Sequence, residues 1–304
     1  MPAWNRQRER GSPTALRLIL WIALHLGRRP ARLILYPITV YFLGKAVAQR
    51  RASREFLTRV LGRKVGLVDV GRHIHCFAAT ILDRVFLLAG RLEQFDVHFH
   101  QPELITERVA AGGGFLLLGS HLGSFEVMRA MAIEAAGMPL KILMDPGHNR
   151  RLTDLLHELN PAIAASVIPL TGPYPLLAVS ETLQRGGVVG LLGDRCLPGE
   201  RTVSCNFLGA PARFPTGPFS LAALTGVPVI LAFGLYRGGN RYDLHFELLT
   251  DRLTLERRDR TTALQDHAQR YADRLAHYTR DAPYNWFNFY DFWEADTDEA
   301  LAEH

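Results

Sequence analysis

Residues 115–126 read FLLLGSHLGSFE, and this stretch indicates how the chain folds. The apolar run Phe115–Leu118 has the length of a buried strand, and the Gly-Ser pair after it is typical of a turn. A helix is predicted to follow, with Glu126 in its first turns. In such a strand–turn–helix unit His121 lies at the carboxyl edge of a sheet, where open α/β folds place their ligands.

The same alternation continues through the centre of the chain. The predicted strands are Phe115–Leu118, Lys141–Met144, Ser166–Pro169, Val188–Leu192 and Val227–Leu235, and the predicted helices between them are Val127–Ala136, Arg151–Leu159 and Leu176–Gln184. This alternation indicates an α/β fold with a largely parallel central sheet flanked by helices. Tyr242–Leu248 alternates between apolar and polar residues and is predicted as an edge strand, and Arg260–Tyr278 is predicted as a long helix.

The first 50 residues differ from the rest of the chain in charge and hydropathy. They hold nine Arg and Lys against one acid, whereas the remaining chain has 26 basic and 29 acidic residues. Two apolar segments, Ala15–Leu26 and Leu33–Leu43, are each shorter than the roughly 20 residues of a spanning helix. A basic excess beside apolar segments suits an anionic membrane surface better than nucleic acid, for which the sequence carries no motif.

We therefore predict that residues 1–50 form a membrane-associated N-terminal segment of helices and that residues 51–304 form one catalytic domain. The alternative is a hydrophobic hairpin that packs on the protein's own core. Cys76, Cys196 and Cys205 are odd in number and lack metal-ligand spacing, so neither a disulfide framework nor a metal site is expected. No cofactor is expected either, because the glycines around the central strand lack the pattern of a nucleotide-binding loop.

His121 and Glu126 are predicted to form a base and the acid that orients it. A carboxylate in the first helical turns can fold back toward the imidazole, which fixes the tautomer and stabilises the imidazolium. An acid near a helix N-terminus is also favourable for electrostatic reasons alone. Asp194-Arg195 after a strand, and the tight turn Phe214–Pro218, are further candidates, although an ion pair and a rigid turn would explain them too.

Taken in order, these motifs resemble those of glycerolipid-type acyltransferases. More narrowly, the chain resembles the bacterial lauroyl/myristoyl (lipid A late) acyltransferase family, within the lysophospholipid acyltransferase superfamily, up to about Trp293. The stretches that carry this resemblance are FAATILDR at 77–84, GSHLGSFEVMR at 119–129, NFLGAPARFPTGP at 206–218 and PYNWFNFYDFW at 283–293. The aromatic ending resembles the branch found beside aryl-polyene pigment and related lipid gene clusters.

The resemblance implies a bacterial inner-membrane enzyme whose catalytic domain faces the cytoplasm. It would move an acyl chain from an acyl-carrier-protein or CoA thioester to a hydroxyl of a lipid or glycolipid acceptor. His121 and Glu126 match the family's catalytic pair, with His121 as the general base. The substrate-binding residues that the resemblance implies are Ser124, Arg129, Arg150, Asp194, Arg195, Phe214, Pro215, Thr216 and Gly217.

Two alternatives remain open at this point. The first is a non-catalytic membrane protein that binds lipid on the same fold, and the second is a transferase that uses an aryl-polyene acyl donor. From Ala282 to His304 the chain has six acids and no Arg or Lys. Such a tail near the site would repel a bis-phosphorylated disaccharide, so we expect an acceptor less anionic than lipid A. The aromatic residues of this ending are expected in the core or on a membrane-facing surface.

Overall fold

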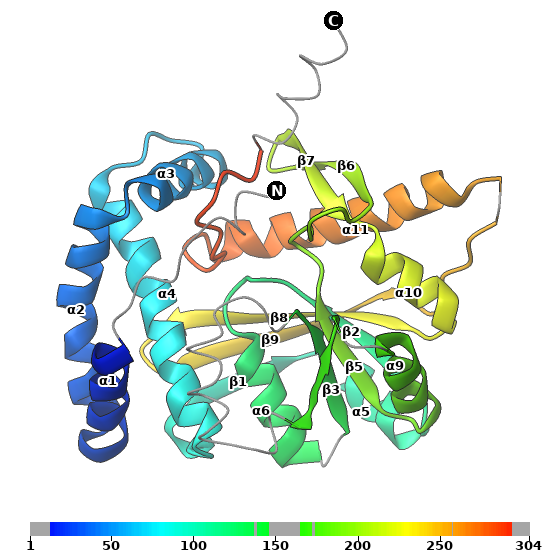
Figure 1. Ribbon diagram of the computed structural model, residues 1–304, viewed down its shortest axis with the longest axis horizontal. Helices are drawn as coiled ribbons and strands as arrows, with labels where there is room; N and C mark the ends of the chain where they lie inside the picture. Colours follow the sequence, from blue (N-terminus) through cyan, green and yellow to red (C-terminus); the bar gives the residue numbers. More distant parts are fainter. Residues whose placement is uncertain (1–12, 137–138, 146–164, 172–173, 257, 294–304) are drawn as a thin grey trace, which may run out of the picture.

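The computed structural model describes residues 13–136, 139–145, 165–171, 174–256 and 258–293 of the chain (Figure 1). The helices are α1 (Pro13–Leu26), α2 (Arg28–Lys45), α3 (Val47–Leu61), α4 (Leu67–Leu88), α5 (Glu103–Ala110), α6 (Phe125–Ala136), α9 (Pro175–Gln184), α10 (Gly217–Thr225) and α11 (Arg260–Asp281). The strands are β1 (Asp96–His100), β2 (Phe115–Gly119), β3 (Leu140–Met144), β4 (Val167–Pro169), β5 (Val188–Leu192), β6 (Thr202–Phe207), β7 (Ala210–Pro215), β8 (Val229–Gly238) and β9 (Arg241–Thr250).

A seven-stranded sheet in the order β1-β9-β8-β2-β5-β3-β4 organises the molecule. Every neighbouring pair is parallel except β8 with β9. All five residues of the central strand β2 are buried, as expected where helices cover both faces of a parallel sheet. The predicted α/β fold with a largely parallel sheet is thus confirmed. A separate antiparallel hairpin, β6 and β7, lies outside this sheet.

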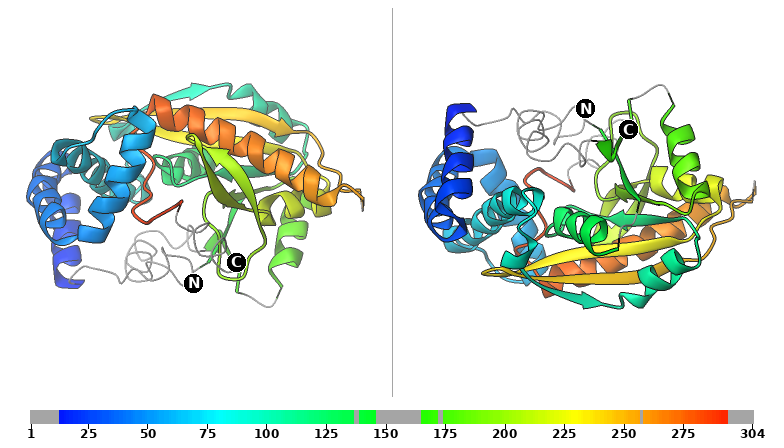
Figure 2. Two further views of the ribbon diagram at one scale, coloured as in Figure 1. Left: turned by 90° about the horizontal axis from the view of Figure 1, so that it is seen from above. Right: turned by 90° about the horizontal axis from the view of Figure 1, so that it is seen from below.

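The two faces of the sheet carry separate apolar cores. Because successive side chains of a strand point to opposite faces, Phe115 and Leu117 join a cluster with α4 and α6, whereas Leu116 and Leu118 join one with α9, α10 and α11. Figure 2 shows α11 running along its face of the sheet, opposite α6. The helices therefore bury both faces of the strand that leads to His121.

The prediction of Tyr242–Leu248 as an edge strand is wrong. β9 contains these residues but lies inside the sheet, between β8 and β1, with Val97 opposite Tyr242. The edge belongs instead to β1, which reads DVHFH and is mostly exposed. Its short, polar sequence suits an exposed edge and hides its strand character from a search for apolar runs. The predicted helix Arg151–Leu159 lies outside the described residues.

Helices α1 and α2 pack against α4 (Figure 1), and a buried ion pair joins α2 to α4. The guanidinium of Arg28 donates two hydrogen bonds of 2.8 Å to the carboxylate of Asp83, which also accepts one from the Tyr242 hydroxyl at 2.9 Å. Asp83 is fully buried. Removal of one partner of such a pair leaves an uncompensated charge in the interior, so these contacts fix the N-terminal helices to the body.

The opposite face of the N-terminal helices is apolar and exposed. Leu33, Tyr36 and Val40 project from α2 with 67%, 62% and 72% of their surface exposed, and Trp21 of α1 is 53% exposed. Within the described residues, no single helix has both the length and the hydropathy of a membrane span. Only α2 and α3 taken together meet those criteria, and the two are bent by 97° at their junction.

Candidate active site

His121 lies in the turn that joins the carboxyl end of β2 to α6. The Tyr271 hydroxyl donates a hydrogen bond of 2.8 Å to the Gly119 carbonyl, and the Ser124 N–H donates one of 2.8 Å to the Gly234 carbonyl in β8. Gly123 has φ +69°, and a Cβ there would lie 1.9 Å from that same carbonyl oxygen. Only glycine fits at this position, and the turn is thereby held against β8.

Asp194 holds the His121 side chain from the end of the adjacent strand β5. The Nδ1 atom of His121 lies 2.8 Å from Oδ1 of Asp194, and the backbone N–H of His121 donates to Oδ2 at 2.9 Å. Because a carboxylate only accepts hydrogen bonds, Nδ1 carries the ring proton and Nε2 is left with a lone pair. The Asp194 side chain is 1% exposed and that of His121 is 29% exposed.

The charges around this pair keep the imidazole neutral and the carboxylate ionised. Burial lowers the pKa of His121, and the nearby Arg195 cation lowers it further, while Asp194 opposes both. Burial alone would raise the pKa of the Asp194 carboxyl. The positive charge that His121 carries at the low pH of this titration, the hydrogen bonds that His121 donates and the Arg195 cation together hold that pKa at about 2. The arrangement is that of a neutral base held by an ionised acid, ready to take a proton on Nε2.

The hydrogen bond that orients His121 therefore comes from Asp194, whereas the sequence analysis assigned it to Glu126. Glu126 is in the first turn of α6, and its Oε1 accepts a hydrogen bond of 3.3 Å from Arg129. Arg129 is 4% exposed and also donates to the Ser166 hydroxyl at 2.8 Å. Both side chains brace α6 against the segment before β4, and neither bonds the imidazole among the described contacts.

The remaining predicted site residues have different surroundings. Arg195 is half-buried beside Asp194 and donates a hydrogen bond of 3.0 Å to the Phe287 carbonyl. Ser124 is fully buried behind the His121 turn, and Arg150 lies outside the described residues.

The turn Phe214–Gly217 joins β7 to α10 and is tightly fixed. The Thr216 N–H and hydroxyl both donate to the Arg201 carbonyl, at 2.9 and 3.1 Å. A Cβ at position 217 would lie 2.5 Å from a carboxylate oxygen of Glu200. Phe214 is fully buried, and its ring meets that of Tyr271, the residue that bonds Gly119. The turn thus has the rigid structural character that the sequence also allowed.

Sequence reasoning missed Trp286 as a residue of the site. Its indole N–H donates a hydrogen bond of 2.9 Å to Oδ2 of Asp194, and the side chain is fully buried. The only signal in the sequence was the dense aromatic run Tyr284–Trp293, which was expected in the core or at a membrane-facing surface. Trp286 is indeed core, but one edge of its ring faces the candidate acid.

One group of side chains outside this site has the composition of a metal site. Ligand atoms of His100, Asp243 and His245 lie within 4.8 Å of one another at the pairing of β1 with β9. The two imidazoles stack at 4.1 Å with an interplanar angle of 5°, so their lone pairs lie in two nearly parallel planes and cannot both point in-plane at one ion. Asp243 is already bonded by Arg237 and Arg241, which would repel a cation. This geometry does not fit a metal.

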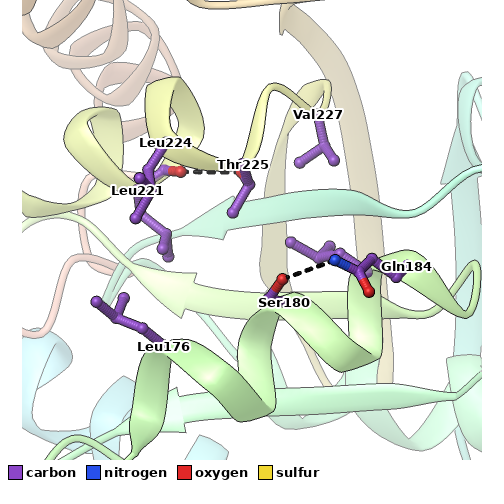
Figure 3. Close-up of a pocket in the computed structure, with 8 residues that line it drawn as sticks. Leu176, Ser180, Gln184, Leu221, Leu224, Thr225 and Val227 are labelled. Carbon is purple, nitrogen blue, oxygen red and sulfur yellow. Dashed lines mark hydrogen bonds between the residues drawn. The ribbon is translucent and has the colours of Figure 1, made fainter.

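An apolar hollow lies between α9 and α10 (Figure 3). It measures about 440 Å³, and its lining residues are Leu176, Ser180, Leu183, Gln184, Leu221, Leu224, Thr225 and Val227. Leu183 lies beside Gly114 at the amino end of β2, and Val227 lies two residues before β8. The hollow thus extends toward the amino ends of these strands, whereas His121 follows the carboxyl end of β2.

The chain is similar to known lipid acyltransferases. The model of the family described as bacterial lipid A biosynthesis acyltransferase matches residues 17–294. A phosphatidylinositol mannoside acyltransferase of Mycolicibacterium smegmatis is 28% identical over 280 residues, which cover 86% of this chain and 87% of the relative. A phosphatidylinositol mannoside acyltransferase of Mycobacterium tuberculosis is 26% identical over 230 residues, which cover 74% of this chain and 65% of the relative.

Proposed function

The chain belongs to the family of bacterial lipid A biosynthesis acyltransferases, and from this membership we propose that it acylates a hydroxyl of a glycolipid acceptor with His121 as the general base. It is an O-acyltransferase that acts on lipid acceptors. The observation that carries the proposed catalysis is the bond between Nδ1 of His121 and Asp194, because it leaves Nε2 as the base. Asp194 takes the orienting role, and Glu126 acts indirectly by holding Arg129.

The proposed reaction needs no covalent acyl-enzyme. Nε2 of His121 removes the proton of the acceptor hydroxyl as its oxygen attacks the thioester carbonyl, which forms the C–O bond. The C–S bond then breaks, and the imidazolium returns the proton to the leaving thiolate. The Asp194 carboxylate stabilises the imidazolium between these steps. General-base catalysis of this kind contributes about 10² to 10⁴ in rate, and positioning of the substrates supplies the rest.

We propose acyl carrier protein as the donor and a glycolipid less anionic than lipid A as the acceptor. The names of the two mycobacterial relatives support a mannosylated phospholipid as the model acceptor. Neither name refers to a pigment cluster, so the narrower resemblance to that branch stays a prediction. We further propose attachment to the cytoplasmic side of the inner membrane through residues 1–50, which the exposed apolar face of α2 supports.

The proposal is tested by mass spectrometry of membrane lipids from a strain with the gene and a strain without it. The mass that disappears with the gene names both the acyl chain and the acceptor, and expression of the parent protein but not of His121→Ala should restore it. Identical lipid profiles in all strains would reject the transferase in favour of a lipid-binding protein. Restoration of hexa-acylated lipid A in a strain that lacks late acylation would reject the proposed acceptor alone.

A further inference from the structure

A segment near the end of the described chain, residues 284–288, crosses directly behind His121. We call it the C-terminal strap. The N–H of Gly123 donates a hydrogen bond of 2.8 Å to the Asn285 carbonyl, and the N–H of Phe287 donates one of 2.9 Å to the His121 carbonyl. The strap therefore pairs with the backbone of the turn on both sides of Leu122, and Leu122 and Trp286 form an antiparallel bridge there.

Asp194 accepts hydrogen bonds at both of its oxygens from groups held by this arrangement. Oδ1 is bonded by the His121 ring, while Oδ2 receives the His121 N–H and the Trp286 indole N–H, each at 2.9 Å. The indole N–H is thus a donor to the acid, and among the described hydrogen bonds it donates none to the imidazole. A buried carboxylate with three donors has few other orientations open to it.

The strap is itself fixed, so the indole N–H has a defined position. The Trp286 ring lies edge-on to Phe56, Phe207 and Phe292, with centroid distances of 5.0, 5.0 and 4.9 Å. Its carbonyl accepts a hydrogen bond of 2.9 Å from the buried His73. These contacts come from α3, α4, β6 and the strap's own continuation, so several parts of the fold determine where the indole points.

We propose that Trp286 is a positioning residue that acts on the reaction through Asp194, by fixing the carboxylate plane that in turn aims Nε2 of His121. The inference rests on the proposed function, in which His121 is the base. Without the indole N–H, the Asp194 carboxylate loses one hydrogen-bond donor and rotates more freely. Its negative charge is then less neutralised by hydrogen bonds and stabilises the imidazolium more strongly. The rate should therefore fall while the pKa of His121 rises.

The test uses the full chain with Trp286→Phe, which keeps an aromatic ring in the core but removes the donor. With palmitoyl-acyl-carrier-protein and phosphatidylinositol mannoside vesicles as probes, kcat should fall about tenfold while KM stays within about twofold, as expected for loss of one hydrogen bond to a charged group. The acid limb of the kcat/KM profile should move to higher pH. The matched control is Trp293→Phe, whose indole donates to the Phe207 carbonyl at 3.4 Å and not to Asp194.

Other charged or titratable groups beside His121 and Asp194 also influence the acid limb of the kcat/KM profile. Those charged or titratable groups are Arg84 of α4, Arg195 and Cys196 after β5, Tyr271 of α11, and Tyr290. Trp286→Phe changes none of them chemically, so a shifted limb reports on the bond to Asp194. In an Asp194→Asn background, Trp286→Phe should add no further loss, because the two residues act through one bond.

Two further measurements distinguish a wrong inference from misfolding of the variant and from a wrong proposed function. Benzothienylalanine at position 286 preserves the shape of the ring without its N–H and should reproduce the kinetic change if Trp286→Phe is too unstable to assay. The pKa of His121, read by NMR of the labelled imidazole, should rise in either variant. If the parent is inactive with this donor and this acceptor but the pKa of His121 still rises in the variants, the proposed substrates fail and the coupling between Trp286 and His121 stands. Equal kcat, pH profile and His121 pKa in the parent and in the variants would overturn the inference.

Discussion

Gly119 and Leu192 are register partners at the carboxyl ends of β2 and β5, and His121 and Asp194 each follow two residues later. The proposed base and its acid are thus at equivalent positions on two adjacent parallel strands, 73 residues apart in the chain. The strand pairing itself brings them within hydrogen-bond distance. Local helix geometry, which would have favoured Glu126, plays no part in it.

Replacement of His121 by alanine should abolish acyl transfer and leave the fold nearly unchanged. The side chain is 29% exposed, and the described part of the chain gives its ring one hydrogen-bond partner, Asp194, so it adds little packing. Turnover should fall by about 10² to 10⁴, the usual contribution of a positioned general base. Acyl transfer is measured by mass spectrometry of the product, with thermal unfolding as the control. Activity within about threefold of the parent would rule out the mechanism.

Asp194→Asn and Glu126→Gln should have different pH profiles, because the described contacts join Asp194 to the imidazole and Glu126 to Arg129. Asp194 raises the pKa of His121 against burial and Arg195, so loss of its charge should lower that pKa and move the acid limb of kcat/KM to lower pH. Glu126→Gln weakens the contact with Arg129 and should leave the acid limb in place. A shifted limb in Glu126→Gln alone would return the orienting role to Glu126.

His73 should make the protein less stable as the pH falls from 7 to 5. Burial lowers its pKa to about 4, so between about pH 6.5 and pH 4 the unfolded chain binds a proton that the folded protein does not. Stability is therefore full above the unfolded pKa and is lost as the pH falls, by about 2 kcal/mol at pH 5. Urea unfolding of the parent and of His73→Gln at both pH values measures this, and an equal loss in both proteins would contradict it.

The exposed face of α2 should be required for membrane attachment. Leu33→Gln, Tyr36→Gln and Val40→Gln together remove side chains that are more than 60% exposed, and the triple variant should move to the soluble fraction. The matched control replaces three exposed leucines of α9 and α10, Leu176, Leu177 and Leu224, and should stay with the membrane. Deletion of residues 1–48 is a poorer test, because it would also strip Arg28 from the buried Asp83.

A salt wash distinguishes apolar attachment through α2 from electrostatic attachment through the basic residues. Apolar burial is not screened by ions, so high salt alone should leave the parent protein bound. Complete release at high salt would show that the basic residues of the N-terminal segment, rather than the face of α2, hold the protein at the membrane.

The sheet was predictable from the sequence where strands are buried on both faces, since β2 and β5 read as uninterrupted apolar runs. β1 was not, because an exposed edge strand needs no apolar residues. The same limit applies to the site. His121 follows a recognisable strand and was found, whereas its bond to Asp194 depends on which strand lies beside β2. Trp286 depends on where the strap crosses, which no local pattern records.

The C-terminal strap also has a consequence for the time at which the site is assembled during translation. The ribosome makes β2, β5 and every other strand of the sheet before it reaches Trp286. A nascent chain that has folded as far as β9 already holds His121, but the donor to Asp194 and the backbone partners of Gly123 and His121 are still to be synthesised. The pair of His121 and Asp194 thus receives its last support only after residue 287 has left the exit tunnel, long after the N-terminal helices have emerged and can reach the lipid surface proposed for them.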